Sequence, residues 1–473
     1  MIDIQSLTLA QLSKLKVHFI GIGGAGMSGI ARIMLARAIE VSGSDKNESQ
    51  MTLALKALGA KIYIGHQADQ IKGADLIIVS AAIAKNNPEF EAAVAAGLPI
   101  APRATALAWL LSDSTSVAVA GTHGKTTTTA MLTVALQAAG LDPSFAIGGT
   151  INSAGTNAHS GSGNIFVVEA DESDGSFLAY KPNGGIITNI EMDHVDHFTS
   201  EEQLFQTFSD FIKTIKSGGF VVVCGDDPGV RKLIAMNANL DLKFITYGQS
   251  SENDFQISKV NLAPNGATAQ ISVTGRKTGE LQLVVPGIHN LLNALAAFAA
   301  GSALGASESK LLQGLTSFTG TKRRFELKGE VNGIKVIDDY GHHPTEIYVT
   351  LTAARNLAGA GRLIVIFQPH RFSRTAAFAK EFATSLSLGD FVYLLEVYAA
   401  SEKPIEGVSS LLIAKDMNSA QVKFEPSMLE VVDEVTAMAK PGDLIITLGA
   451  GDVSSLSTPI LDALALTHKS NNK

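Results

Sequence analysis

Cysteine is nearly absent from this sequence, which contains one, Cys224, among 473 residues. A single cysteine excludes an internal disulfide and a thiolate metal cluster within the chain. Because Cys224 lies inside the apolar run FVVVCGDD, we expect a buried structural thiol. Any catalytic or metal-binding chemistry must therefore come from other side chains.

An excess of positive charge and a long hydrophobic run are also missing. The formal net charge is -8, so the chain lacks the basic surface that nucleic-acid binding requires, and we expect no such partner. No stretch reaches about 18 uninterrupted apolar residues, and the N-terminal stretch lacks the pattern of a secretory signal. We therefore expect a cytoplasmic protein without membrane insertion, whose oligomeric state is left open.

Aromatic residues are scarce at 6%, whereas glycine occurs 44 times. With 46% apolar and 17% charged residues, this composition is typical of α/β enzymes rich in tight turns. A domain of roughly 100–200 residues is the common size. The length therefore indicates several domains, and we expect three.

Apolar runs alternate with amphipathic stretches in three successive series, which is typical of βαβ units and parallel sheets. The series contain the strands KVHFIGIG, SVAVAG and IKVIDDYG. Between about residues 255 and 286 a period-two pattern predicts antiparallel strands appended to the second sheet. The predicted fold is α/β with three domains: a Rossmann-like domain over 1–112, a central P-loop ATPase domain with a mostly parallel sheet over 113–321, and a C-terminal Rossmann-like α/β domain over 322–473.

The stretch GTHGKTTTT lies between a predicted strand and a predicted helix. Backbone N–H groups near Gly121 and Gly124 can converge on phosphate oxygens. Lys125 can reach the terminal phosphates, and the Thr126 hydroxyl can hold Mg²⁺. The usual phosphate loop has another glycine where this chain has Val119. Two interpretations follow: a chance Gly-Lys-Thr turn, or the shorter loop of another ATPase lineage.

A second glycine loop, GIGGAG, occurs about a hundred residues earlier. Gly21, Gly23 and Gly26 match G-x-G-x-x-G, and Asp45 follows at about the distance of a ribose-binding acid. The pattern supports a diphosphate at a helix N-terminus without selecting the base. Taken alone it is also typical of NAD or FAD binding, and the glycines can serve helix–sheet packing only.

Acidic residues and histidines follow two buried strands of the second series, where α/β sheets place their ligands. An acid opposite Thr126 is what Mg²⁺ coordination in nucleotide hydrolysis requires, and a histidine beside carboxylates is a candidate second metal ligand. A solvated acidic turn and an ordinary loop histidine are the alternatives. The residues are Glu169, Asp171, Glu172 and Asp174 in VVEADESDGS, and Asp193, His194, Asp196 and His197 in TNIEMDHVDHF.

Arginines and histidines recur at the start and the strand ends of the third series. Arginine makes bidentate contacts with carboxylates and phosphates, although any one of them can be ordinary surface charge. The clusters are RRF, DDYGHHPTE and QPHRFSR, which contain Arg324, Asp339, His342, His343, Arg371 and Arg374.

Eight motifs in order resemble the Mur ligases of peptidoglycan synthesis, from about residue 16 to 455: GIGGAGMSGIA, GTHGKTTTTAM, EADESDGSF, NIEMDHVDHF, PGIHNLLNALAA, RRFE, DDYGHHPTEI and QPHRFSRT. Within the family they resemble the branch that adds L-alanine to UDP-N-acetylmuramate through an acyl phosphate. The resemblance implies ATP and Mg²⁺, with Mn²⁺ as a substitute, and domains that close about linkers near 112–115 and 320–322. The loop without a glycine at Val119 is the family's form.

The resemblance also implies roles for individual residues. Lys125, Glu169 and His194 are expected to be catalytic, and Thr126, Glu169 and His194 to hold the metal ions. The UDP-sugar is expected at Gly21, Gly23, Gly24, Gly26, Asp45 and Arg103. L-Alanine is expected at Tyr340, His342, Arg371 and Arg374. ATP is expected at Gly121, Thr122, His123, Gly124, Lys125, Thr126, Thr127, His289, Asn290, Asn293, Arg324 and Asp339.

Some alternatives stay open. Relatives that add later residues carry a carbamylated lysine where this chain has Ser209, so the other ligands of a second metal are unassigned. The proton acceptor for the amine is one of His194, His342 and His343. Rival functions are a murein tripeptide ligase using the same UDP-sugar, an NAD-dependent oxidoreductase and a non-catalytic nucleotide sensor.

Overall fold

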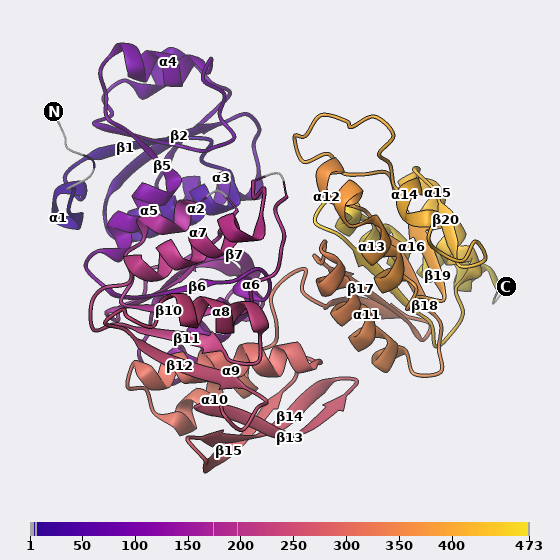
Figure 1. The fold of residues 1–473 in the computed structure, drawn as a ribbon. Coiled ribbons are helices and arrows are strands. Elements are labelled where there is room, and N and C mark those ends of the chain that lie inside the picture. Colours follow the sequence, from indigo (N-terminus) through magenta and orange to yellow (C-terminus); the bar gives the residue numbers. More distant parts are fainter. Residues whose placement is uncertain (1–3, 5–6, 174, 196, 472–473) are drawn as a thin grey trace.

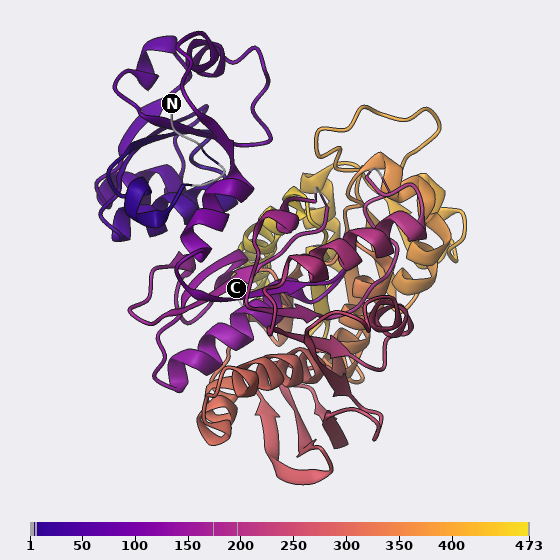
Figure 2. The same cartoon turned by 60° about the vertical axis from the view of Figure 1, so that its left-hand side comes forward.

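The computed structural model of the chain describes residues 4, 7–173, 175–195 and 197–471. Three sheets follow one another along the chain, and each is covered by helices (Figure 1). In the turned view the C-terminal part lies beside the central part, and the N-terminal part projects from the end of the central one (Figure 2). The predicted α/β class is confirmed. The exact boundaries at 112/113 and 321/322 stay predictions.

The first sheet has five parallel strands in the order β3-β2-β1-β4-β5. Because β2 and β4 lie on opposite sides of β1, the loop after β1 opens at the point where strand order reverses, the usual ligand position of such sheets. The strands are β1 (Lys16–Ile20), β2 (Glu40–Asp45), β3 (Lys61–Ile64), β4 (Leu76–Val79) and β5 (Ile100–Pro102). The helices are α1 (Leu9–Leu12), α2 (Ala25–Ala36), η1 (Ala68–Ile71), α3 (Gln50–Ala57), α4 (Pro88–Ala95) and α5 (Arg103–Leu111).

The central sheet has ten strands in the order β15-β14-β13-β12-β11-β10-β6-β9-β7-β8. The predicted antiparallel extension is confirmed at β13, β14 and β15. The strands are β6 (Thr115–Ala120), β7 (Ser144–Ile151), β8 (Thr156–His159), β9 (Ile165–Glu169), β10 (Gly184–Ile187), β11 (Phe220–Cys224), β12 (Lys243–Gly248), β13 (Phe255–Ala263), β14 (Gly266–Val273) and β15 (Arg276–Leu283). The helices are α6 (Lys125–Ala138), η2 (Ser176–Ala179), α7 (Glu201–Thr214), α8 (Pro228–Met236), α9 (Ile288–Ala303) and α10 (Glu308–Thr316).

The third sheet has six strands in the order β16-β17-β21-β18-β19-β20, of which only β16 is antiparallel to its neighbour among the described residues. The strands are β16 (Glu326–Val331), β17 (Ile334–Asp339), β18 (Leu363–Phe367), β19 (Phe391–Leu394), β20 (Val422–Phe424) and β21 (Leu444–Leu448). The helices are α11 (Pro344–Ala358), α12 (Phe372–Ala377), α13 (Ala379–Leu386), α14 (Leu411–Ala414), α15 (Met428–Met438), η3 (Asp452–Leu456) and α16 (Ser457–Asn471).

The first and central sheets share one hydrophobic core, whereas the third sheet has cores of its own. One core runs from the N-terminal sheet through Trp109 and Phe166 to Phe208 under the central sheet. The opposite face of the central sheet packs on α6, α9 and α10. The third sheet has its own cores on its two faces. Within the described part of the chain, no helix is long and apolar enough to cross a bilayer.

Candidate active site between two glycine loops

Three cavities follow one another from the first glycine loop past the second. A cavity of about 290 Å³ lies beside Gly24, Gly26 and Arg103. A cleft of about 830 Å³ contains Lys125, and a cavity of about 470 Å³ lies on the other side of the second loop. Glu169 lines the first two cavities, and Gly124 and Arg324 line the last two. The two glycine loops therefore open onto neighbouring cavities that share lining residues.

The second glycine loop is held by the segment that follows β10. Its φ angle is +129° at Gly121 and +81° at Gly124, a backbone conformation that favours glycine. The backbone N–H of His123 donates to Asn189 Oδ1 at 2.8 Å, and the Thr122 hydroxyl donates to the Glu191 carbonyl at 3.0 Å. These contacts fix the loop at the N-terminus of α6, where backbone N–H groups favour an anion.

Lys125 lies over this loop and pairs with a buried acid. Its Nζ donates to the Gly121 carbonyl at 2.8 Å and to Glu172 at 2.9 Å. Burial lowers the pKa of the Lys125 ammonium, but the surrounding acids, Glu172 foremost, raise it above its usual value. Burial raises the pKa of Glu172 to about 7. Sequence analysis names Glu172 among the acidic residues but does not predict this pairing.

Oxygen ligands gather around Glu169. The Thr126 hydroxyl donates to Glu169 Oε1 at 2.8 Å, and the Gly148 N–H donates to Oε2 at 2.6 Å. Carboxylate and hydroxyl oxygens are ligands that Mg²⁺ prefers. The structure thus brings Thr126 and Glu169 together as expected for a metal site.

His194 lies beside these residues in a strained backbone conformation with φ +50°. Its Nδ1 atom is buried and has no hydrogen-bond partner among the described residues. One ligand atom each of Asp171, Glu172 and His194 lies within 4.8 Å of the others. Ser209, at the position where some relatives carry a carbamylated lysine, is buried in α7, and its hydroxyl donates a hydrogen bond to Asn237 Oδ1 at 2.9 Å. Asp174 and Asp196 lie outside the described residues.

The first glycine loop is closed by two side chains from elsewhere in the N-terminal domain. Gly23 N–H donates to Asp45 Oδ2 at 2.8 Å, so Asp45 holds the loop backbone. A Cβ atom on Gly26 would lie 3.0 Å from Nη1 of Arg103. Gly24 and Gly26 line the cavity with Arg103, whereas Gly21, with φ +82°, forms the turn before them.

The cavity of about 470 Å³ is lined by the residues expected at ATP on α9 and at the start of the third domain. Burial lowers the pKa of His289 to about 4 and raises that of Asp339 to about 6. Asp339 accepts hydrogen bonds from the backbone N–H groups of Phe325 and Gly341 at 2.7 and 2.8 Å. The expected lining residues are His123, Gly124, Thr127, His289, Asn290, Asn293, Arg324 and Asp339.

The residues expected at L-alanine line the central cleft. Tyr340 and His342 follow β17, whereas Arg371 and Arg374 follow β18. Arg374 is not exposed: its side chain is 3% exposed and its Nη2 lies 2.7 Å from Asp193 of the central domain. The guanidinium of Arg374 therefore bridges two domains in this structure, a contact that sequence analysis does not predict.

The three candidate histidines are separated by the fold. His194 and His342 line the central cleft, whereas His343 lines a different cavity of about 800 Å³ between the domains. Burial lowers the pKa of His342 to about 3, so its ring is neutral near pH 7. His370, which sequence analysis does not single out, also lines the cleft, and its ring stacks on Tyr398 at 5.6 Å between centroids.

Comparison with known proteins agrees with this geometry. The chain matches the Mur ligase family catalytic domain over residues 16–115, the Mur ligase middle domain over 119–301 and the Mur ligase glutamate ligase domain over 323–451. It is 50% identical to a UDP-N-acetylmuramate--L-alanine ligase of Renibacterium salmoninarum over 95% of this chain and 96% of the relative. The corresponding protein of Saccharopolyspora erythraea is 48% identical, over 94% and 92%.

Solved structures show the same architecture. The UDP-N-acetylmuramate-alanine ligase MurC of Thermotoga maritima superposes with a TM-score of 0.79 at 30% identity, covering 97% of this chain and all (100%) of that one. A murein peptide ligase of Psychrobacter arcticus superposes with a TM-score of 0.71 at 26% identity, over 95% and 99%. On the sequence motifs, the fold and these matches, the chain belongs to the Mur ligase family.

Proposed function

We propose that this enzyme is an ATP-dependent ligase that joins L-alanine to the lactyl carboxylate of UDP-N-acetylmuramate, in the cytoplasm, for peptidoglycan synthesis. The observation that carries the proposal is the row of neighbouring cavities at the two glycine loops, with Lys125 and Glu169 among the residues that line them. A dinucleotide oxidoreductase would use the first loop alone. The relatives named for this reaction align over nearly the whole chain.

The reaction follows from the poor acylating power of a free carboxylate. The lactyl carboxylate oxygen attacks the γ-phosphorus of ATP, the bond to ADP breaks, and an acyl phosphate forms. The neutral amine of L-alanine then attacks the acyl carbon, the C–O bond breaks, and phosphate leaves. Lys125 offsets charge on the transferred phosphoryl group, since phosphoryl transfer depends mainly on positioning and electrostatics.

The residues around Glu169 fit Mg²⁺. We propose that Thr126 and Glu169 hold one ion and that His194, whose Nδ1 has no partner among the described residues, contributes to a second. Bound Mg²⁺ supplies charge neutralisation for the phosphates. The Thr122 N–H donates to the Asn189 carbonyl at 3.0 Å and so positions the loop, the N–H groups of Gly121 and Gly124 are the ones that would face the phosphates, and α9 residues hold the adenine side.

The outer domains position the two substrates that are joined. We propose that Gly21, Gly23, Gly24, Gly26 and Arg103 hold the UDP diphosphate, with Asp45 fixing the loop. Tyr340, His342, Arg371 and Arg374 hold L-alanine. His194 and His342 are the candidates for the proton acceptor, because His343 lines another cavity.

Amino-acid-dependent ADP formation with UDP-N-acetylmuramate and ATP tests the proposal. L-Alanine and murein tripeptide are supplied in parallel, and the product is identified by mass. We expect turnover with L-alanine and at most a trace with the tripeptide. Turnover with the tripeptide but not with L-alanine would assign the chain to the murein tripeptide ligases. ADP formation at the same rate without either amine would contradict the ligase function.

A further inference from the structure

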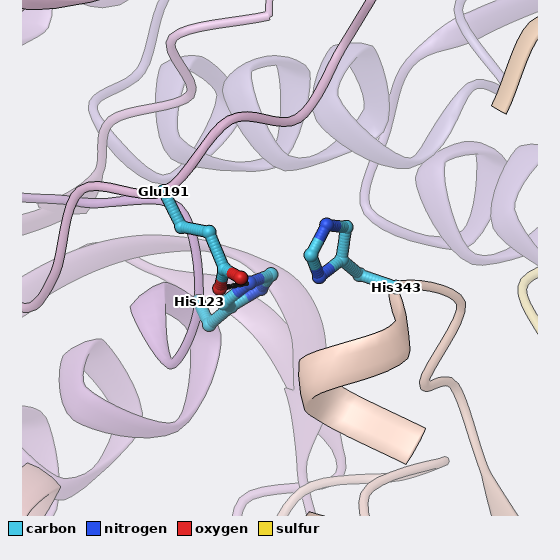
Figure 3. A group of neighbouring side chains, drawn as sticks. All are labelled: His123, Glu191 and His343. Carbon is cyan, nitrogen blue, oxygen red and sulfur yellow. Dashed lines mark hydrogen bonds and ion pairs between the residues drawn. The ribbon is translucent and has the colours of Figure 1, made fainter. Parts of the chain in front are cut away.

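Three side chains from distant parts of the sequence meet at the contact between the central and C-terminal domains (Figure 3). His123 lies in the second glycine loop, Glu191 follows β10, and His343 is the N-cap residue of α11. One ligand atom of each lies within 4.8 Å of the other two. Two histidines and a carboxylate are a ligand set typical of zinc and of other late transition metals.

The first pair, His123 and Glu191, is hydrogen-bonded in this structure. Burial lowers the pKa of His123, but Glu191 and Glu346 raise it to about 9, so a metal ion would bind here by displacing a proton. His123 Nε2 and Glu191 Oε2 are 3.1 Å apart. Two ligands each about 2.0–2.2 Å from a tetrahedral Zn²⁺ ion lie roughly 3.3 Å from each other. The His343 ring faces this pair, with 4.7 Å between its centroid and that of His123 (Figure 3). One ligand atom of His343 lies within 4.8 Å of the ligand atoms of the other two residues, so the ring must move closer to complete the set.

His343 is available as a ligand. The residue is only 2% exposed, and its Nε2 has no hydrogen-bond partner in the described part of the chain. Its Nδ1 accepts a single long hydrogen bond, 3.4 Å, from the Thr345 N–H. A buried nitrogen without a partner is unfavourable in a folded protein. Because Nδ1 accepts in this structure, the ring proton lies on Nε2, and coordination through Nε2 would move that proton to Nδ1 at the expense of the long bond from Thr345.

The surroundings orient the carboxylate and favour a cation. The Thr345 hydroxyl donates to Glu191 Oε1 at 2.7 Å, an outer contact of the kind that fixes metal ligands. Glu346 adds a second carboxylate 3.4 Å from His123 Nδ1. Glu191 is exposed and lines the cavities of about 470 and 800 Å³, so an ion can enter from solvent.

We propose that His123, Glu191 and His343 bind one divalent transition-metal ion of the Zn²⁺ class, and that this ion ties the second glycine loop to α11. The site shares no residue with the Thr126, Glu169 and His194 group. Because two ligands come from the central domain and one from the C-terminal domain, a bound ion holds these domains together. Zn²⁺ at this site therefore slows any step that needs them to separate.

Zinc binding measured without turnover tests this site separately from the proposed reaction. Zn²⁺ is titrated calorimetrically into the full chain without nucleotide, because His123 and Glu191 line the cavity expected to hold ATP, and in the presence of saturating Mg²⁺, which occupies the Thr126 and Glu169 site. The variants are His343→Asn, which keeps a side-chain oxygen for capping α11, and Glu191→Gln, which keeps an oxygen for Thr345. His159→Gln, at an exposed histidine of β8, is the matched control.

We expect one Zn²⁺ per chain in the wild type and in His159→Gln, and at least about tenfold weaker binding in His343→Asn and Glu191→Gln. Zinc should also narrow the distribution of domain separations in X-ray scattering of the wild type but not of Glu191→Gln. Wild-type zinc affinity in either cluster variant overturns the proposal. If His343→Asn does not fold, Glu191→Gln alone decides.

Discussion

The role of Lys125 is predicted by its local sequence, whereas its ion-pair partner is found only in the structure. The glycine loop predicts its role from sequence because the motif, the preceding strand and the following helix are contiguous. Its partner Glu172 lies 47 positions away in the sequence and is brought to 2.9 Å only by the packing of β6 against β9. Without a nucleotide, Glu172 holds the ammonium in place, and we expect phosphate oxygens to compete for it.

Replacing Lys125 with methionine tests its catalytic role while keeping the length of the side chain. We expect kcat to fall by roughly 10²–10³, the effect of losing one preorganised charge in the transition state. Glu172 can then take up a proton, so the fold should persist. Steady-state kinetics and a thermal melt measure the two effects. Lys403→Met, at an exposed lysine, is the control; equal losses in both variants would contradict the role of Lys125.

Cys224 is predicted from sequence as a buried thiol, and it is 7% exposed in the structure. Burial raises its pKa from 9.0 to about 11. Since the thiolate is the reactive form, at pH 9 about one hundredth of the native thiol is ionised, against about half in the unfolded chain. Native protein should therefore resist iodoacetamide at pH 9 and react only as pH approaches 11. Fast alkylation of native protein at pH 8 would contradict this burial.

At the scale of elements, β7 is instructive because sequence analysis does not predict it. Its sequence SFAIGGTI contains Gly148 and Gly149, which weaken a strand pattern. The structure shows what the glycines provide: a Cβ on Gly148 would lie 2.9 Å from a Glu169 oxygen, and one on Gly149 2.9 Å from Cγ2 of Thr126. The strand therefore lacks side chains where Glu169 and Thr126 need room, a requirement that is visible only in three dimensions.

Three edge strands are also not predicted from the sequence, because contacts with distant parts of the chain determine them. Most of the parallel strands are predicted because apolar residues dominate their sequences, although β5, β7 and β20, which also have parallel neighbours, are not. The edge strands β8, β16 and β20 are short or partly exposed, so their sequences carry little periodicity, and pairing with neighbours far along the chain determines them.

The glycine loop before α6 allows a matched substitution. Gly121→Ala would place a Cβ 2.0 Å from Thr188 Oγ1, whereas Gly140→Ala, after the other end of α6, meets open space. Both positions have positive φ. We expect Gly140→Ala to cost about 1 kcal/mol of stability and to leave ATP binding intact, whereas Gly121→Ala should also weaken ATP binding. Denaturant unfolding measures the stability of each variant, and nucleotide titration measures its ATP affinity. Equal ATP affinity in the two variants would contradict a role of the close approach between Gly121 and Thr188 in shaping the ATP site.

At the scale of the whole molecule, a buried ion pair joins the central and C-terminal domains. Asp193 and Arg374 are 5% and 3% exposed, and Arg374 lies in the cluster that resemblance assigns to L-alanine. Nearby, the Lys322 N–H donates to the Thr150 carbonyl at 2.9 Å, so the second predicted linker is held against β7. Neither contact can be predicted from local sequence, because each joins residues more than a hundred positions apart. Any movement of the C-terminal domain about residues 320–322 therefore starts from a state in which this domain already contacts the central domain.

Removing the carboxylate tests this docking. Asp193→Ala leaves Arg374 buried without its partner, a loss that typically costs about 3–5 kcal/mol. We expect the radius of gyration from X-ray scattering to rise as the C-terminal domain separates. The control is Asp210→Ala, which removes an exposed pair with Lys213 worth about 0–1 kcal/mol. An unchanged radius in Asp193→Ala would show that this pair does not hold the domains together.

In the proposed reaction, the cavities at the two glycine loops bring ATP and the sugar carboxylate together, and the carboxylate is activated by phosphorylation. Transfer of ¹⁸O from the lactyl carboxylate of UDP-N-acetylmuramate tests this activation most directly. If an acyl phosphate forms, one carboxylate oxygen leaves with each phosphate, and mass spectrometry of the phosphate released with L-alanine should find one ¹⁸O per molecule from fully labelled substrate. Phosphate without ¹⁸O, formed at the same rate as the amide, would contradict the account.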